Sequence, residues 1–136
     1  MKLRNPLMFS VMILGVILMG LFFTRSHSKV NLISVQETNE KARSDTNFTL
    51  LDVRTPEEYA AGHLANAILI PVQELPQRME ELAPFKSKAI IAYCRTGNRS
   101  GRAAELLGAS GFTVFNMEGG ILKLKESNLP VIEETK

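Results

Sequence analysis

The sequence predicts an α/β domain in which a parallel sheet lies between two layers of helices, preceded by an apolar N-terminal segment. Short apolar runs alternate with helix-like segments from residue 31 to residue 127. Several runs are apolar at consecutive positions, which is typical of strands buried on both faces. A chain of 136 residues has room for one such domain. We therefore expect residues 30–136 to form the domain and residues 1–29 to form a membrane anchor or export signal with a short linker.

The expected strands are short runs rich in apolar and β-branched residues. They cover residues 31–35, 48–53, 67–71, 89–93 and 112–116. The expected helices carry apolar residues on one face and cover residues 36–44, 73–82, 101–108 and 121–127. A further short helix is expected after Thr55, because Pro56 follows this N-cap and Glu58 completes a capping box. Ligand sites in such sheets lie beyond the carboxyl ends of the strands.

One strand end carries the chemistry that the sequence indicates most strongly. Strand 89–93 leads into Cys94, the only cysteine of the chain, and a loop with one glycine and two arginines then leads into a helix. A helix N-terminus offers spare N–H groups and partial positive charge, and Arg95 and Arg99 add full charges. All of these favour the thiolate, which is the nucleophilic form. A lone cysteine is otherwise typical of a small buried hydrophobe, and the arginines favour a functional thiol.

The length of this loop narrows the chemistry. Cys94 to Arg99 is a six-residue C-x4-R spacing. Cysteine phosphatases use C-x5-R, whose larger ring of N–H groups fits a tetrahedral phosphate, and here that position is Ser100. The smaller ring of N–H groups suits a smaller group than phosphate, such as one additional sulfur atom on the cysteine.

Three ordered motifs resemble those of the rhodanese-like sulfurtransferases. They are the loop 94–99, the stretch 50–67 with its Asp-Val-Arg turn and Gly-His pair, and the stretch 111–121 with its Gly-Gly-Ile end. The resemblance runs from about residue 33 to residue 131. It implies sulfur transfer from an anionic donor such as thiosulfate to cyanide, a small thiol or a protein thiol, without a metal or organic cofactor. In the family a tryptophan is usual where this chain has Leu124, which affects the pocket rim.

The resemblance also implies roles for individual residues. Cys94 would be the nucleophile that carries a persulfide. The donor would be bound by the loop residues Arg95, Thr96, Gly97, Asn98 and Arg99, and the supporting residues would be Asp52, Arg54 and Ser100. Asp52 and Arg54 either pair with each other or orient the loop, and in the family they are mainly structural.

Two further features each have a structural and a functional interpretation. His63 could be a base for Cys94, but the matching histidine of the family lies in the scaffold, so we expect a hydrogen-bonded structural residue. That leaves no obvious general base and favours a thiolate activated by the local field. Gly119 and Gly120 could form a phosphate loop, but a tight turn after the last strand is favoured.

Other functions stay open or are disfavoured. A persulfide carrier or protein-interaction module with the same fold is the main alternative to an enzyme. A thiol-redox protein is disfavoured because no second cysteine exists, and an arsenate or phosphate enzyme is disfavoured by loop length. A structural zinc site is disfavoured because only His27, His63 and Cys94 are soft ligands.

The charge distribution excludes nucleic acid as a partner. The whole chain has a formal net charge of +2, while residues 1–29 carry four basic residues and no acidic one. The remaining residues therefore sum to −2. A nucleic-acid-binding domain would show a clear positive footprint.

The N-terminal segment predicts a membrane association. Residues 7–23 are 17 uncharged and mostly apolar residues. As a helix they span about 26 Å, near the lower limit for a bilayer core of roughly 30 Å. We favour an uncleaved anchor over a cleaved export signal because no convincing cleavage site follows. A buried helix of the domain is disfavoured because the segment is apolar all round. We expect the domain to be extracytoplasmic (periplasmic), with a cytoplasmic-facing domain or a cleaved secreted form as the alternatives.

Overall fold

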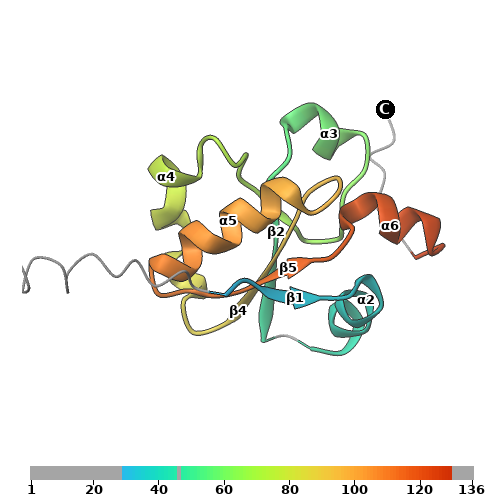
Figure 1. Cartoon of the computed structure of the whole chain (residues 1–136), viewed down its shortest axis with the longest axis horizontal. Helices are drawn as coiled ribbons and strands as arrows, with labels where there is room; N and C mark the ends of the chain where they lie inside the picture. The colour runs from blue at the N-terminus through green and yellow to red at the C-terminus, as the bar shows by residue number, and fades with distance from the viewer. Residues whose placement is uncertain (1–28, 46, 130–136) are drawn as a thin grey trace, which may run out of the picture.

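Five parallel strands form the sheet of this computed structural model, which describes residues 29–45 and 47–129 (Figure 1). The strands are β1 (Asn31–Ile33), β2 (Phe48–Asp52), β3 (Ile68–Leu69), β4 (Ala89–Tyr93) and β5 (Thr113–Met117). Their spatial order is β1-β5-β4-β2-β3, and every neighbouring pair is parallel. Strand β4 therefore lies between β5 and β2, so its carboxyl end is flanked on both sides by the ends of other strands.

Helices cover both faces of this sheet and confirm the predicted three layers. The helical elements are α2 (Val35–Ser44), α3 (Pro56–Ala60), α4 (Leu75–Arg78), the 3₁₀ helix η1 (Met79–Phe85), α5 (Asn98–Ala109) and α6 (Gly120–Glu126). Residues of α4, η1 and α5 pack in one apolar core, and residues of α2 and α6 pack in the other. Successive β4 side chains alternate between the two: Ile90 and Ala92 join the first core, and Ile91 and Tyr93 join the second.

Several element boundaries differ from the prediction by one to three residues, among them α5, which begins at Asn98 rather than at residue 101. Two of the differences have identifiable reasons. The first strand ends at Ile33 rather than at residue 35, because Ser34 is the N-cap of α2 and forms a capping box with Glu37. The predicted helix 73–82 is divided into a short α4 and the 3₁₀ helix η1. Pro84 lies inside η1 and has no backbone N–H to donate, which disfavours a continuous α-helix there.

The expected capping box after Thr55 is confirmed. The Thr55 hydroxyl accepts from the backbone N–H of Glu58, and the Glu58 carboxylate accepts from the backbone N–H of Thr55. Pro56 occupies the first turn of α3, as predicted. This box fixes Glu58 at the start of a short helix that leads away from the end of β2.

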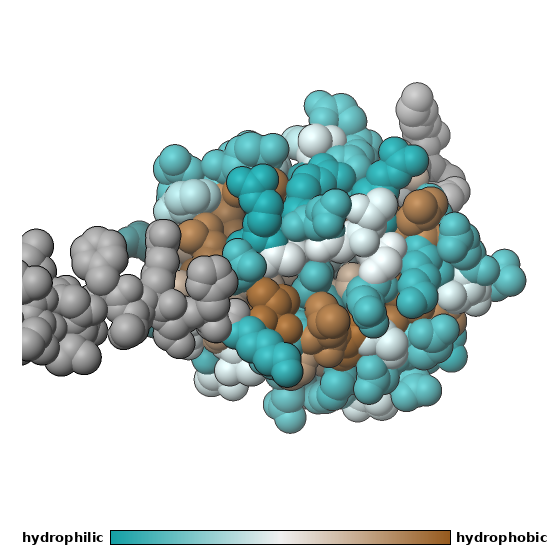
Figure 2. All heavy atoms as spheres, in the orientation of Figure 1, coloured by the Kyte–Doolittle hydropathy of each residue, from teal (hydrophilic) through white to brown (hydrophobic). Residues whose placement is uncertain are grey.

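The surface of the domain is largely polar. Hydrophilic residues cover most of the face seen in Figure 2, and the apolar atoms on it form separate patches. The exposed large apolar residues in the described part of the chain are Leu32, Leu106 and Leu122. Within residues 29–45 and 47–129, no helix has both the length and the apolar character needed to cross a bilayer. The anchor predicted at 7–23 lies outside the described residues and stays a prediction.

Candidate active site

The candidate nucleophile lies at the centre of the carboxyl edge of the sheet. Cys94 directly follows β4, and helix α5 begins at Asn98. Cys94 is only 1% exposed, so its sulfur depends on protein groups rather than on water for hydrogen bonds. The predicted loop from Cys94 to Arg99 thus spans the end of a buried strand and the first turn of a helix.

Backbone and side-chain donors of the loop surround the sulfur. The Gly97 N–H donates to Cys94 Sγ at 3.1 Å, and Ser100 Oγ lies 3.3 Å from the same atom. Gly97 has a φ of +105°, a left-handed conformation that few other residues adopt without strain. Glycine is therefore needed to turn this N–H toward the sulfur.

These donors explain the acidity of the thiol. Burial works to raise the pKa of Cys94, but hydrogen bonds from Ser100 and from the N–H groups of Gly97 and Thr96 outweigh burial and lower that pKa below its ordinary value. The helix N-terminus and the arginines are both expected to favour the thiolate. Hydrogen bonds at the start of α5 have the larger effect on the pKa of Cys94, and Arg99 also interacts electrostatically with the sulfur.

The start of α6 holds the loop from the other side. The N–H of Ile121 donates to the Cys94 carbonyl at 2.9 Å, and the N–H of Leu122 donates to the Arg95 carbonyl at 3.1 Å. Gly119 and Gly120 have φ values of +77° and +62° and make the tight turn that brings these N–H groups to the loop. The predicted tight turn after the last strand is thus confirmed, and it brings the start of α6 to the cysteine loop.

The two loop arginines have different surroundings. Arg99 forms a two-pronged ion pair with Glu58 of α3, with Nη1–Oε2 and Nη2–Oε1 distances of 2.7 and 2.8 Å. The side-chain hydrogen bond from Arg99 holds the pKa of Glu58 at about 2, against partial burial. Arg95 is exposed and forms no ion pair within the described part of the chain. Thr96 and Asn98 are also exposed, at the mouth of the loop.

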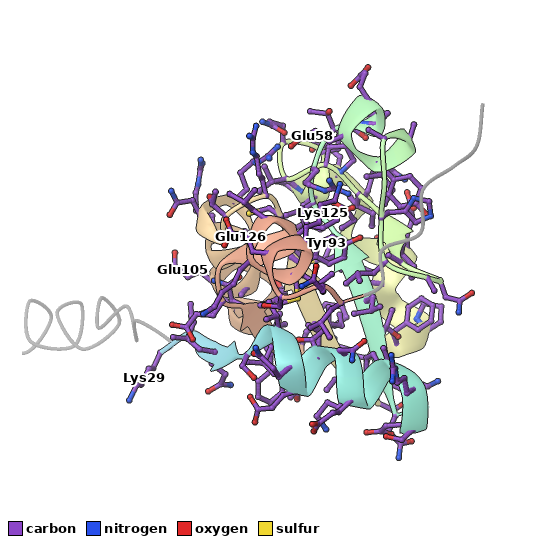
Figure 3. The ribbon with its side chains drawn as sticks, turned by 90° about the vertical axis from the view of Figure 1, so that its right-hand side faces the viewer. Lys29, Glu58, Tyr93, Glu105, Lys125 and Glu126 are labelled. Atoms are coloured by element: carbon purple, nitrogen blue, oxygen red, sulfur yellow. The ribbon has the colours of Figure 1, made fainter. Side chains whose placement is uncertain are left out.

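Glu58 is a residue that the sequence analysis assigned only to a helix cap. It lies on α3 at the top of Figure 3, 41 positions before Arg99 in the chain. The ion pair between Glu58 and Arg99 depends on where α3 lies in the folded domain. A local sequence pattern does not contain this information.

Asp52 and Arg54 pair with each other, which was one of the two predicted roles. Arg54 Nε and Nη2 donate to the Asp52 carboxylate, with an Nη2–Oδ2 distance of 2.6 Å. Arg54 also donates to the Gly62 carbonyl and lies over the ring of buried Tyr93, 5.6 Å from its centroid. The pair is buried, and its bond to Gly62 ties the turn before His63 to the end of β2. The Tyr93 hydroxyl holds the same turn by accepting from the Leu64 N–H at 3.0 Å.

His63 has the structural environment that was expected. Its Nδ1 lies 2.9 Å from the Tyr59 carbonyl, and its ring stacks on the Tyr59 ring with centroids 3.7 Å apart. In the described residues, no histidine or carboxylate is hydrogen-bonded to Cys94 Sγ. The arrangement therefore supplies a thiolate through hydrogen bonds and not through a neighbouring base.

Asn116 is a site residue that the sequence analysis missed. Its Oδ1 accepts from Ser100 Oγ at 2.6 Å, and its Nδ2 donates to the Gly97 carbonyl at 3.0 Å. One sequence feature could have indicated Asn116: it is an amide side chain near the end of a buried strand. That strand lies next to the strand that leads to the cysteine. Ser100, predicted to be supporting, is fully buried and contacts both Cys94 and Asn116.

The turn at Gly120 yields the first testable prediction. A Cβ at this position would overlap the carbonyl groups of Cys94 and Arg95, and the φ of +62° adds strain. We expect Gly120→Ala to displace the loop and to slow alkylation of Cys94 by iodoacetamide at neutral pH at least tenfold, because the N–H donors leave the sulfur.

Gly108→Ala is the matched control. Gly108 lies within α5 and has no positive φ, so alanine there is favourable to the helix. Equal alkylation rates in both variants and in the unmodified protein would show that the α6 contact does not hold the loop.

Comparison with known proteins agrees with this geometry. The Rhodanese-like domain family model matches residues 34–127. A sulfurtransferase of Allochromatium vinosum is 33% identical over 104 residues, which are 76% of this chain and 95% of the relative. The thiosulfate sulfurtransferase PspE of Escherichia coli is 36% identical over 83 residues, covering 61% of this chain and 77% of the relative. A crystal structure of a rhodanese-related protein from Thermoplasma volcanium has a TM-score of 0.70 at 35% identity and covers 76% of this chain and 99% of that one. With its sheet, its cysteine loop and these relatives, the chain belongs to the rhodanese-like domain family and has single-domain sulfurtransferases among its homologues.

Proposed function

We propose that this protein transfers sulfane sulfur from an anionic donor, with thiosulfate as the model donor, to a nucleophilic acceptor through a persulfide on Cys94. The observation that carries the proposal is the environment of the buried Cys94 sulfur, which accepts hydrogen bonds from N–H groups of a six-residue loop. The chain contains no second cysteine that could pair with Cys94. A lone thiolate in such a ring can hold one more sulfur atom. It cannot form a disulfide within the chain.

The reaction has two half-reactions that balance. In the first, the Cys94 thiolate attacks the outer sulfur of thiosulfate. A new S–S bond forms, the S–S bond of thiosulfate breaks, and sulfite leaves with the electron pair. In the second, an acceptor such as cyanide or a thiolate attacks the terminal sulfur, and the Cys94 thiolate leaves. With cyanide the product is thiocyanate.

The loop suits both half-reactions. The thiolate forms without a base, because hydrogen bonds lower the pKa of Cys94 against the effect of burial. The same N–H groups stabilise negative charge on the persulfide, in the manner of an oxyanion hole. Neither half-reaction needs a metal or an organic cofactor. The name of the Escherichia coli relative supports thiosulfate as a donor.

Charge at the mouth of the loop would attract the donor. Arg95 is exposed and provides a full positive charge, while Glu58 offsets part of the charge of Arg99. Because the pKa of Glu58 is about 2, the Arg99–Glu58 pair stays ionised above about pH 4. This pair therefore adds no pH dependence to donor binding near neutral pH.

The central experiment measures the intact mass of the protein after incubation with thiosulfate. We expect the mass of one added sulfur atom, and its loss after cyanide is added. Cys94→Ser should show neither step, because a serine hydroxyl cannot carry the sulfur as a persulfide. Thiocyanate production by the serine variant would contradict the mechanism, and a persulfide that no acceptor removes would favour the carrier function.

The ion pair at the loop mouth gives a second prediction for the same activity. Arg99→Ala removes a charged hydrogen-bond donor and leaves Glu58 unpaired near the site, so kcat/KM for thiosulfate should fall roughly 10- to 100-fold. Glu58→Gln keeps the cap of α3 and frees the charge of Arg99, so KM for thiosulfate should decrease. Steady-state thiocyanate production at low salt measures both effects.

Glu57→Gln is the matched control, because Glu57 lies in the same first turn of α3 and forms no ion pair within the described part of the chain. We expect its kinetics to equal those of the unmodified protein. Unchanged kinetics in both Arg99→Ala and Glu58→Gln would contradict a role of this ion pair in donor binding. Arg95 and the backbone N–H groups would then bind the donor.

We further propose that residues 7–23 anchor the protein in a membrane and that the domain is extracytoplasmic. The proposal is supported by the uncharged apolar run and by the cations on both sides of it. The full chain should stay with membranes after an alkaline wash, and protease added to intact spheroplasts should digest the domain. Release by the wash would contradict the anchor, and protection until lysis would contradict the orientation.

A further inference from the structure

The Ser100 hydroxyl has two acceptors within reach and only one proton. Its oxygen lies 2.6 Å from Asn116 Oδ1 and 3.3 Å from Cys94 Sγ. All three side chains are buried, so water does not supply a replacement donor freely. A hydroxyl can donate to one acceptor at a time.

The orientation of the Asn116 amide decides which acceptor takes that proton. The Gly97 carbonyl lies 3.0 Å from the amide nitrogen, and a carbonyl only accepts, so the NH₂ end must face Gly97. A flipped amide would place two acceptor oxygens against each other. The Oδ1 end therefore faces Ser100, and it also only accepts, so Ser100 donates to Asn116 at the shorter of the two distances.

This arrangement satisfies the protonated cysteine completely. When Ser100 donates to Asn116 and Asn116 donates to Gly97, the Ser100 oxygen is free to accept from the Cys94 S–H across the 3.3 Å that separates Oγ from Sγ. The thiolate breaks this chain. A negative sulfur needs the Ser100 proton, and if the hydroxyl turns to the sulfur, the buried Asn116 Oδ1 loses its donor.

We propose that Asn116 is a positioning residue that competes with the Cys94 sulfur for the single Ser100 proton and so sets how readily the sulfur becomes a thiolate. The thiol part of the inference stands on the geometry alone. Its consequence for sulfur transfer rests on the proposed function. A persulfide moves the negative charge from Sγ to the outer sulfur, so the Ser100 proton can return to Asn116 until the acceptor removes that sulfur.

The charged groups on the loop and on the neighbouring elements do not bond Ser100 or Asn116, although Arg99 interacts electrostatically with Cys94 itself. They come from the loop, from α3, from the end of β2 and from the end of β5. They are Arg95, Arg99, Glu58, Asp52, Arg54 and Glu118. None of them has a side-chain hydrogen bond to Ser100 or Asn116, so substitution of Asn116 removes no ion pair.

The test is the pH profile of Cys94 alkylation by iodoacetamide in the full chain. Cys94 is the only cysteine, so the reaction reports on this thiol alone. In Asn116→Ala, Ser100 has no competing acceptor and donates to the thiolate. We expect the pKa of Cys94 to fall by about one unit, which is the size of one hydrogen bond. Asn116→Leu fills the site without adding an acceptor, and it should show the same direction if the alanine variant does not fold.

A double-variant cycle separates this role from a merely structural one. In a Ser100→Ala background there is no proton to compete for, so adding Asn116→Ala should leave the pKa of Cys94 unchanged. An equal fall with and without Ser100 would overturn the proposal, as would an unchanged or raised pKa in the single variant. The titration uses no sulfur donor, so it remains informative even if thiosulfate leaves no persulfide on Cys94.

Discussion

The site depends on which way the peptide groups of the cysteine loop point, and two hydrogen bonds from α6 hold two of these groups. The N–H groups of Ile121 and Leu122 bind the carbonyls of Cys94 and Arg95. In a planar peptide the N–H and C=O groups point in opposite directions, so the N–H groups of Arg95 and Thr96 turn away from α6, and the Thr96 N–H helps to lower the pKa of Cys94. The Gly97 N–H belongs to the next peptide, and the positive φ of Gly97 orients it. Two ends of neighbouring strands thus cooperate: β4 delivers the cysteine, and the turn after β5 delivers the helix that orients its loop. The absence of a side chain at Gly120 makes this approach sterically possible.

A buried nucleophile creates a second constraint, because burial disfavours the charged thiolate. The structure offsets this cost mainly with local donors. Gly97 and Ser100 contact the sulfur, and the guanidinium of Arg99 pairs with Glu58 while also interacting electrostatically with Cys94. The local donors therefore have the larger effect on the acidity of the sulfur, and in the proposed function the arginines also attract the anionic donor. In the proposed function, a negatively charged acceptor such as cyanide or a thiolate is attracted by the same arginines.

Much of the fold could be predicted because its signals are local. The buried strand 89–93 and the capping box at Thr55 appear in the structure at the predicted residues. The division of helix 73–82 could not be read from apolar spacing, because the spacing is compatible with both α and 3₁₀ geometry. Within the site, the importance of the cysteine loop came from its position after a strand and from the motif resemblance. The contacts of Glu58 and Asn116 are 41 and 16 positions away in the chain, and pairing over such distances has no signature in composition or periodicity.

The residues missed by the sequence analysis share a physical character that explains why they matter. Glu58 and Asn116 each hold two other groups in place: Glu58 binds the Thr55 N–H and the Arg99 guanidinium, and Asn116 binds the Ser100 hydroxyl and the Gly97 carbonyl. A side chain with two such bonds has little freedom to relax when the charge beside it changes. In the proposed reaction the loop therefore binds a thiolate, then a persulfide, then a thiolate again with the same set of donors. The movement that this requires is the rotation of one hydroxyl, that of Ser100. A preorganised site of this kind avoids the cost of reorienting dipoles at each half-reaction, which is the main advantage that fixed protein donors have over water.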